Sequence, residues 1–268
     1  ALRFIHFTSL MLVFGFAMYG AWLAPLTIRR LLAKRFLRLQ QHAAVWSLIS
    51  ATAMLAVQGG LMGTGWTDVF SPNIWQAVLQ TQFGGIWLWQ IVLALVTLIV
   101  ALMQPRNMPR LLFMLTTAQF ILLAGVGHAT LNEGVTAKIH QTNHAIHLIC
   151  AAAWFGGLLP VLWCMQLIKG RWRHQAIQAL MRFSWCGHFA VIGVLASGVL
   201  NALLITGFPP TLTTYWGQLL LLKAILVITC GAASAAAELV SNRNARILFF
   251  IIFVIHQKGS RVASRLMI

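Results

Sequence analysis

Three histidines stand in one short stretch, "KIHQTNHAIHLICAAAWFGGL", at residues 138–158. His140, His144 and His147 follow one another at i, i+4 and i+7, so on a helix they share one face over two turns. The stretch then runs without a break into apolar sequence. A titratable side chain at the edge of a membrane segment is energetically unfavourable, which makes it a functional candidate. The spacing therefore predicts a nitrogen-donor site.

Further donors are expected on the same side of the membrane. His6 lies near the start of the chain, and His128 precedes the triplet. Imidazole is a common ligand of copper and zinc, while thioether and thiol sulfur favour Cu(I). Met11 and Cys150 supply such sulfur. We therefore predict a copper site whose candidate ligands are His128, His140, His144 and His147, with His6 and Met11 as secondary ones.

Carboxylates are scarce, and this narrows the choice of metal. The whole chain has three acidic residues, Asp68, Glu133 and Glu238. Magnesium, calcium and manganese prefer several carboxylate oxygens, so these metals are disfavoured. The same scarcity argues against a proton-driven pump with a carboxylate relay.

Two alternatives to copper stay open. Histidine pairs on neighbouring membrane helices also hold b-type haem, so His6, His128, His144 and His147 are alternative axial ligands. The chain would then transfer electrons, with periplasmic Cu(II) as one acceptor. A purely structural subunit, whose histidine rings rest in the headgroup region, is the remaining alternative.

Composition sets the environment of these residues. Hydrophobic residues make up 60% of the 268 residues, charged residues 8%, and the mean hydropathy is +0.83. Soluble domains carry about 25% charged residues, so this is a membrane protein. The net charge of +16 does not indicate nucleic-acid binding, because the bases lie in short clusters between long apolar runs.

The chain is predicted to be an all-α, polytopic transmembrane helix bundle. Apolar runs of about 20 residues span a bilayer as helices. We expect the first run to be a membrane helix and not a signal peptide, because it is long enough to span. The seven runs are about 2–24, 43–62, 86–103, 111–127, 145–168, 184–205 and 217–237.

The basic residues predict the orientation of the bundle. Every second connection carries Lys and Arg, as in 29–38, 106–110, 169–182 and 243–246, whereas the alternate connections carry only Lys138. Basic connections face the cytoplasm, so the N-terminus and the histidine triplet are predicted on the periplasmic side.

The C-terminal segment differs from the rest. Its apolar run at 247–255 is too short to cross the membrane unaided, so an eighth helix is left open. We therefore divide the chain into a transmembrane domain at 1–227 and a divergent segment at 228–268.

Other chemistry finds no support in the sequence. There is no GxxxxGK[ST] phosphate-binding motif, so the chain is not expected to drive transport with ATP. The four cysteines form no CxxC pair, so neither a disulfide nor a zinc-ribbon site is supported. Enzymatic activity is not expected outside the haem alternative, in which the chain would be a metal reductase.

An ordered series of motifs resembles the CopD family of copper resistance proteins. The matching stretches are "LRFIHFTSLMLVFG" (2–15), "QTQFGGIWLWQI" (80–91), "GVGHATLN" (125–132), "HQTNHAIHLICAAAWFGGLLPVL" (140–162) and "TYWGQLLLLKAIL" (214–226). The resemblance implies an eight-helix bundle in the bacterial inner membrane with a role in copper transport or homeostasis. It also implies a periplasmic copper-binding partner of the CopC type.

The resemblance also implies roles for particular residues. The outer histidines of the family correspond to His6, His128, His140, His144 and His147. Trp154, Gly156 and Gly157 belong to the signature of the fifth predicted helix, where glycine permits close helix packing, and Lys223 belongs to the seventh. Besides membrane lipid and the CopC-type protein, a second copy of the chain is left open as a partner, and nucleic acid is not expected.

Overall fold

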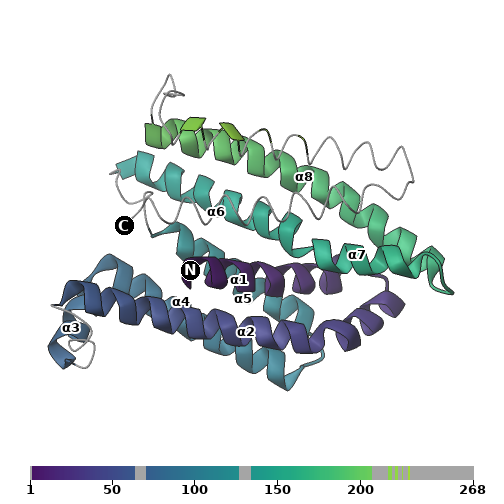
Figure 1. Cartoon of the computed structure of the whole chain (residues 1–268), viewed down its shortest axis with the longest axis horizontal. Helices are drawn as coiled ribbons and strands as arrows, with labels where there is room; N and C mark the ends of the chain where they lie inside the picture. The colour runs from purple at the N-terminus through teal and green to yellow at the C-terminus, as the bar shows by residue number, and fades with distance from the viewer. Residues whose placement is uncertain are drawn as a thin grey trace. The chain divides into compact units, whose positions relative to one another are not determined.

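The computed structural model describes residues 2–63, 71–126 and 134–206, together with residues 217, 218, 221, 222, 225 and 229. Every regular element in this part of the chain is helical (Figure 1). The elements are α1 (Leu2–Met18), η1 (Tyr19–Leu23), α2 (Leu26–Met62), α3 (Pro72–Gln80), α4 (Gln82–Met103), α5 (Met108–Ala124), α6 (Gly134–Gly156), α7 (Leu158–Leu167) and α8 (Arg173–Thr206).

The predicted fold class, an all-α membrane helix bundle, is confirmed. Within the described ranges, five helical segments are long and apolar enough to cross a membrane: Leu2–Leu23, Leu26–Met62, Gln82–Met103, Gly134–Leu167 and Arg173–Leu204. The shorter apolar helix α5 adds a sixth segment. These six correspond to the first six predicted runs. The seventh run is described only at isolated helical residues between 217 and 229, and the C-terminal segment lies outside the described residues.

Helix α2 is longer than the apolar run that predicts it. Its 37 residues include the basic stretch 29–38, which we expected to be a connection. No proline interrupts it after Pro25, and Leu, Ala, Lys, Arg and Gln favour helix. At 1.5 Å per residue the helix is about 55 Å long, well beyond the roughly 30 Å of a hydrocarbon core.

Two local features were not predicted. Helix α3 is a short amphipathic helix with Pro72 in its first turn and Val78 as its buried residue. The predicted fifth helix is interrupted at Gly157, which separates α6 from α7. Pro160 accounts for the break, because it has no N–H to donate to the carbonyl of Gly156.

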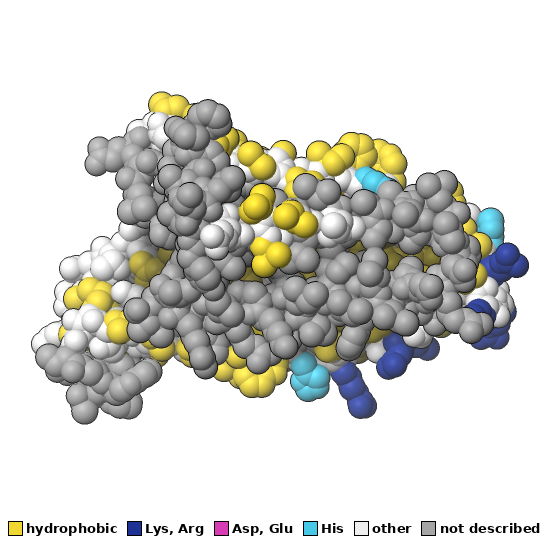
Figure 2. All heavy atoms as spheres, turned by 45° about the horizontal axis from the view of Figure 1, so that its top comes forward, with side chains coloured by type: hydrophobic (Ala, Val, Ile, Leu, Met, Phe, Trp, Pro, Cys, Tyr) yellow, Lys and Arg dark blue, Asp and Glu magenta, His cyan; other side chains and the backbone are white. Residues whose placement is uncertain are grey.

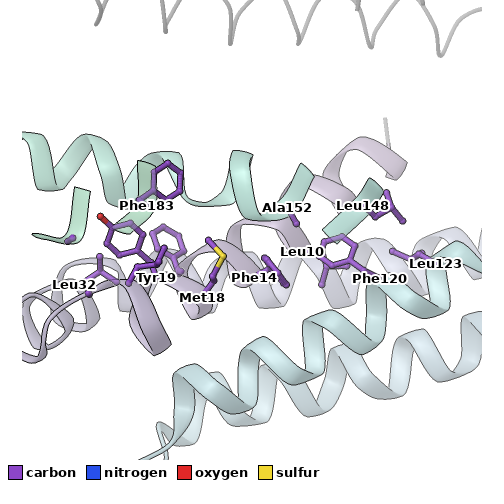
Figure 3. Close-up of a cluster of buried hydrophobic side chains, with 14 of the residues drawn as sticks. Leu10, Phe14, Met18, Tyr19, Leu32, Phe120, Leu123, Leu148, Ala152 and Phe183 are labelled. Carbon is purple, nitrogen blue, oxygen red and sulfur yellow. The ribbon is translucent and has the colours of Figure 1, made fainter. Parts of the chain in front are cut away.

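Helix α1 forms the centre of the hydrophobic core. It packs against α2, α5 and α6, while α4 packs against α2 and α5. Leu10, Phe14 and Tyr19 of α1 and η1 are fully or almost fully buried, together with Phe120 of α5. Figure 3 shows these side chains gathered between the helices. Most of the segment Leu2–Leu23 is buried among other helices. This burial explains why nearly every face of the helix is apolar.

Contacts between α1 and α2 show that the two helices are antiparallel. Nη2 of Arg29 donates to the carbonyl of Ala21 at 3.0 Å, and the rings of Phe16 and Phe36 stack with centroids 5.0 Å apart. His6 near the start of α1 contacts Ser47, much further along α2. The first half of α2 therefore lies beside the second half of α1.

Helix α1 crosses α6 at two glycines. A Cβ added to Gly15 would overlap the backbone of Gly156, and one added to Gly156 would overlap the carbonyl of Met11. The two backbones are thus in direct contact, a separation that only glycine allows.

The chain divides into two compact units. One comprises Leu2–Ser197, and the other comprises Gly198–Ile268 together with Ala1. All contacts discussed below belong to the first unit. The predicted boundary near residue 227 falls outside the described residues and stays a prediction.

Candidate functional site

His6 is fully buried and hydrogen-bonded through both ring nitrogens. Its Nδ1 lies 3.1 Å from the carbonyl oxygen of Ser47 and 3.1 Å from Oγ of Ser50. Its Nε2 lies 3.2 Å from the amide nitrogen of Gln90. An amide nitrogen can only donate, so Nε2 is the acceptor and Nδ1 carries the proton. His6 is therefore neutral, with its lone pair on Nε2.

A chain of polar side chains continues from His6 through the bundle. Nε2 of Gln90 also donates to Oε1 of Gln119 at 3.3 Å, and Nε2 of Gln119 donates to Oγ1 of Thr97 at 2.9 Å. All four side chains are almost completely buried. The network joins α1, α2, α4 and α5, and its groups replace the hydrogen bonds that water would otherwise supply.

The contacts of His6 fix its depth. Gln90 lies near the middle of α4, and Gln119 lies within α5, not at its end. Trp87 closes the site from α4, with its ring centroid 5.7 Å from that of His6 and its Nε1 donating to the carbonyl of Ala51 at 2.7 Å. His6 therefore lies level with the interior of the α4 span, although it is close to the start of α1.

The three histidines of α6 differ in burial. His140 is buried at 3% exposure, whereas His144 and His147 are half-buried. They lie on the helix from Gly134 onward, so the stretch that we expected to lead into the fifth helix is already helical. Their spacing of i, i+4 and i+7 puts them on one face of α6.

Helix α8 contacts this part of α6 through Ser197. Nδ2 of Asn143 donates to the carbonyl oxygen of Ser197 at 2.8 Å, and Nδ1 of His147 lies 3.0 Å from its Oγ. One turn further along, a Cβ added to Gly193 would lie 2.6 Å from Sγ of Cys150. We call this contact the α6–α8 interface, made by Asn143, His147 and Cys150 with Gly193 and Ser197.

The hydroxyl of Ser197 determines the tautomer of His147. It donates its hydrogen to the carbonyl of Gly193 one turn earlier, so Nδ1–H of His147 is the donor in their contact. The ring lone pair then lies on Nε2. Metal-binding histidines commonly have this arrangement, in which the other ring nitrogen donates to a fixed acceptor that orients the ring.

The described residues do not bring the predicted ligands together. No group of three His, Cys, Asp or Glu side chains in this part of the chain lies close enough to hold a metal ion. His6 belongs to the α1–α2–α4–α5 network, whereas His147 belongs to the α6–α8 interface. His128 lies outside the described residues, so the complete predicted set stays a prediction.

The remaining predicted residues have structural surroundings of their own. Met11 is half-buried beside the crossing of α1 and α6, and Trp154 is half-buried on α6. Gly156 makes the crossing itself, and a Cβ at Gly157 would overlap the ring of Phe183 in α8. Lys223 lies outside the described residues.

Sequence reasoning missed several polar residues of these sites. Gln90 and Thr97 stand alone inside an apolar run, Gln119 follows two threonines inside another, and Ser197 stands in a run of small and apolar residues. A polar side chain isolated within a membrane helix is itself a signal, because it needs a partner there. Which partner it meets depends on helix packing, which the sequence does not give.

Comparisons with known proteins identify the family of the chain. The model of the copper resistance protein D-like N-terminal domain matches residues 1–139, and the copper resistance protein D model matches residues 177–253. Copper resistance protein D of Pseudomonas syringae pv. tomato is 29% identical over 248 residues, which are 88% of this chain and 79% of the relative. No solved structure matches. With its apolar spanning helices, the chain is a multi-pass membrane protein that belongs to the copper resistance protein D (CopD) family.

Proposed function

We propose that the chain is a copper-handling protein of the bacterial inner membrane. Copper arrives from the periplasm at the histidine face of α6, where His140, His144 and His147 are the candidate ligands, with His128 as a further candidate. The protein then imports the copper or delivers it. The family membership supports copper as the cargo.

The hydrogen bond between His147 and Ser197 is the observation that carries this proposal. It holds Nδ1 as a donor, so Nε2 has the lone pair that a metal ion requires. Neutral imidazole is a good ligand for both copper oxidation states. His144 lies on the same face of the helix, one turn nearer the N-terminal end of α6.

His6 and Met11 serve as secondary candidates at a deeper level. His6 has the same tautomer as His147, with Nδ1–H directed to the backbone carbonyl of Ser47. Its Nε2 is occupied by the amide of Gln90, so copper would bind there only after that amide moves away. His6 is also fully buried, whereas His144 and His147 are half-buried, so we assign first contact with copper to α6.

A periplasmic copper-binding protein of the CopC type is the proposed donor. The predicted orientation, with Lys138 and the α6 histidines outside, gives such a donor access to the face that we assign to copper. No ATP-binding motif occurs in the sequence, so movement of copper is downhill, coupled to another gradient, or limited to delivery at the membrane.

The test is the metal content of the purified full-length chain after incubation with Cu(I), measured together with a visible spectrum. The variant His144→Ala/His147→Ala removes two candidate ligands. The matched control is His174→Ala/His188→Ala, which removes two exposed histidines of α8 that bond to Gln178 and Ser184 of their own helix. We expect copper to be lost in the first variant and retained in the second.

Equal copper retention in both variants would contradict the proposed site. A Soret band that disappears in His144→Ala/His147→Ala would instead assign these histidines to haem. No feature of the described residues favours haem, since His6 uses both ring nitrogens within the bundle.

A further inference from the structure

One end of the helix bundle is strongly basic. In the unit Leu2–Ser197, the first part of α2, the α4–α5 connection with the start of α5, and the α7–α8 connection with the first part of α8 lie at the same end of antiparallel neighbours, and they carry most of the Lys and Arg residues. Figure 2 shows these side chains gathered at one end of the visible face. The exposed bases at this end are Arg30, Lys34, Arg35, Arg38, Arg106, Arg110, Lys169, Arg171, Arg173 and Arg182.

Helix α2 orders three of these charges into a row. Arg30, Lys34 and Arg38 are exposed and stand at i, i+4 and i+8, so they lie along one face of the helix over two turns. We call these three residues the α2 basic row. Like charges at i and i+4 repel one another, so the row is unfavourable unless anions are nearby.

The described part of the chain provides no carboxylate to neutralise this row. The three acidic residues, Asp68, Glu133 and Glu238, all lie outside the described residues. Within the described residues, the basic end therefore has no acidic side chain as counter-charge, and anions outside the protein can supply it.

The position of the row along α1 identifies its surroundings. The bond from Arg29 to Ala21 and the stacking of Phe36 on Phe16 put this part of α2 beside the final, apolar part of the first spanning segment. Trp22, which is 49% exposed, lies at the same level and packs edge-on against Phe113. Exposed tryptophan is typical of the membrane interface, where lipid headgroups lie.

The start of α5 reaches the same level. Cβ of Pro109 lies 3.4 Å from the position of a Cβ added to Gly20, and the neighbouring Arg110 is exposed. Basic side chains therefore surround the end of α1 and η1 from two helices. Such a surface repels metal cations and matches the phosphate groups of an anionic leaflet.

We propose that the α2 basic row is a binding site for the phosphate headgroups of anionic phospholipids in the leaflet at the basic end. The guanidinium groups of Arg30 and Arg38 bind phosphate oxygens in a bidentate manner, and the ammonium group of Lys34 adds a point charge between them. Lipid is favoured over a soluble anion because the row lies beside a membrane-spanning helix. The site is independent of the proposed copper site.

The test measures binding of fluorescent phosphatidylglycerol and phosphatidylcholine to the full-length chain in neutral detergent. We expect preferential binding of phosphatidylglycerol that weakens with salt, since salt screens exposed charges. In the variant Arg30→Gln/Lys34→Gln/Arg38→Gln this affinity should fall roughly tenfold or more. The variant Arg30→Lys/Arg38→Lys keeps the charge and should retain most of the binding.

A control variant that loses the same charge elsewhere at the basic end tests whether the α2 basic row itself binds the lipid. The variant Arg171→Gln/Arg173→Gln/Arg182→Gln removes three exposed bases at the α7–α8 connection and the start of α8. We expect it to bind phosphatidylglycerol almost as well as the parent chain. Circular dichroism verifies that each variant is folded.

Three results would overturn the proposal. The first is equal affinity for the two lipids, and the second is an equal loss of binding in the two triple glutamine variants. The third is displacement of phosphatidylglycerol by millimolar inorganic phosphate, which would indicate a site for the free anion.

Discussion

At the scale of single residues, His6 and His147 both carry the ring proton on Nδ1, but they donate it to different kinds of acceptor. His6 directs Nδ1–H to a backbone carbonyl on α2, and His147 directs it to a hydroxyl on α8. Each acceptor comes from another helix, so helix packing selects the tautomer in both cases. At His6 the Gln90 amide donates to Nε2.

Gln90→Leu should destabilise the bundle by about 0.5–2 kcal/mol. The substitution leaves Nε2 of His6 and Oε1 of Gln119 without the donor that both now share. Thermal unfolding in detergent measures the effect. Gln82→Leu, at an exposed position of the same helix, serves as the control and should change the midpoint little. Equal shifts in the two variants would mean that the network contributes nothing to stability.

Ser197→Ala should weaken copper binding about tenfold, because it removes the acceptor that orients the ring of His147. Cu(I) titration against a competing chelator measures the affinity. Ser197→Thr retains the hydroxyl and should restore most of it. Thr52→Ala, which removes an exposed hydroxyl that bonds within α2, is the matched control. Unchanged affinity in Ser197→Ala would remove His147 from the proposed site.

At the scale of helices, the sequence predicts the spans well and their ends poorly. Apolar runs located the five segments that are long enough to span and the shorter helix α5, because the membrane core requires apolar side chains. The same criterion ends a predicted helix wherever charge begins, so the basic half of α2 was expected to be a connection. Helix ends depend on backbone breakers instead, and Pro160 interrupts the fifth predicted helix within its apolar run.

Gly156→Ala should destabilise the protein by about 1–3 kcal/mol, because its Cβ would overlap the carbonyl of Met11 where α6 crosses α1. Gly85→Ala is the control, since a Cβ there meets nothing within 4 Å. Alanine favours helix over glycine, so this control should be neutral or slightly stabilising. Thermal unfolding of the two variants distinguishes a steric clash at the α1–α6 crossing from the effect of alanine on helix propensity. A neutral Gly156→Ala would show that α1 and α6 separate readily.

At the scale of the whole molecule, composition and periodicity were enough to predict the membrane class and the helical fold. They also identified the histidine face of α6. They did not predict that His6 and His147 lie in different sets of helices, because the sequence contains no information on which polar faces meet. Gln90 and Ser197 are single polar residues in apolar runs, and they acquire a role only when α4 and α8 pack against α1, α2 and α6.

The distribution of charge predicts which end of the molecule faces the cytoplasm. Exposed bases gather at the α4–α5 and α7–α8 connections, whereas Lys138 stands at the opposite end, at the start of α6. By the positive-inside rule, Lys138 and the α6 histidines are predicted to face the periplasm. Lys138→Cys should therefore react with a membrane-impermeant maleimide in intact cells, and Arg106→Cys should react only after permeabilisation. The unsubstituted chain gives the background from its four cysteines, of which Cys164 is buried, Cys150 and Cys186 are half-buried, and Cys230 lies outside the described residues.

The opposite labelling pattern would place the α6 histidines on the cytoplasmic side. Copper would then meet them only after crossing the membrane, and a periplasmic donor could not deliver to α6. Labelling of both positions in intact cells would indicate that the protein inserts in both orientations. The basic residues would then not determine its topology. This measurement therefore decides whether, in the proposed function, α6 would receive copper or release it.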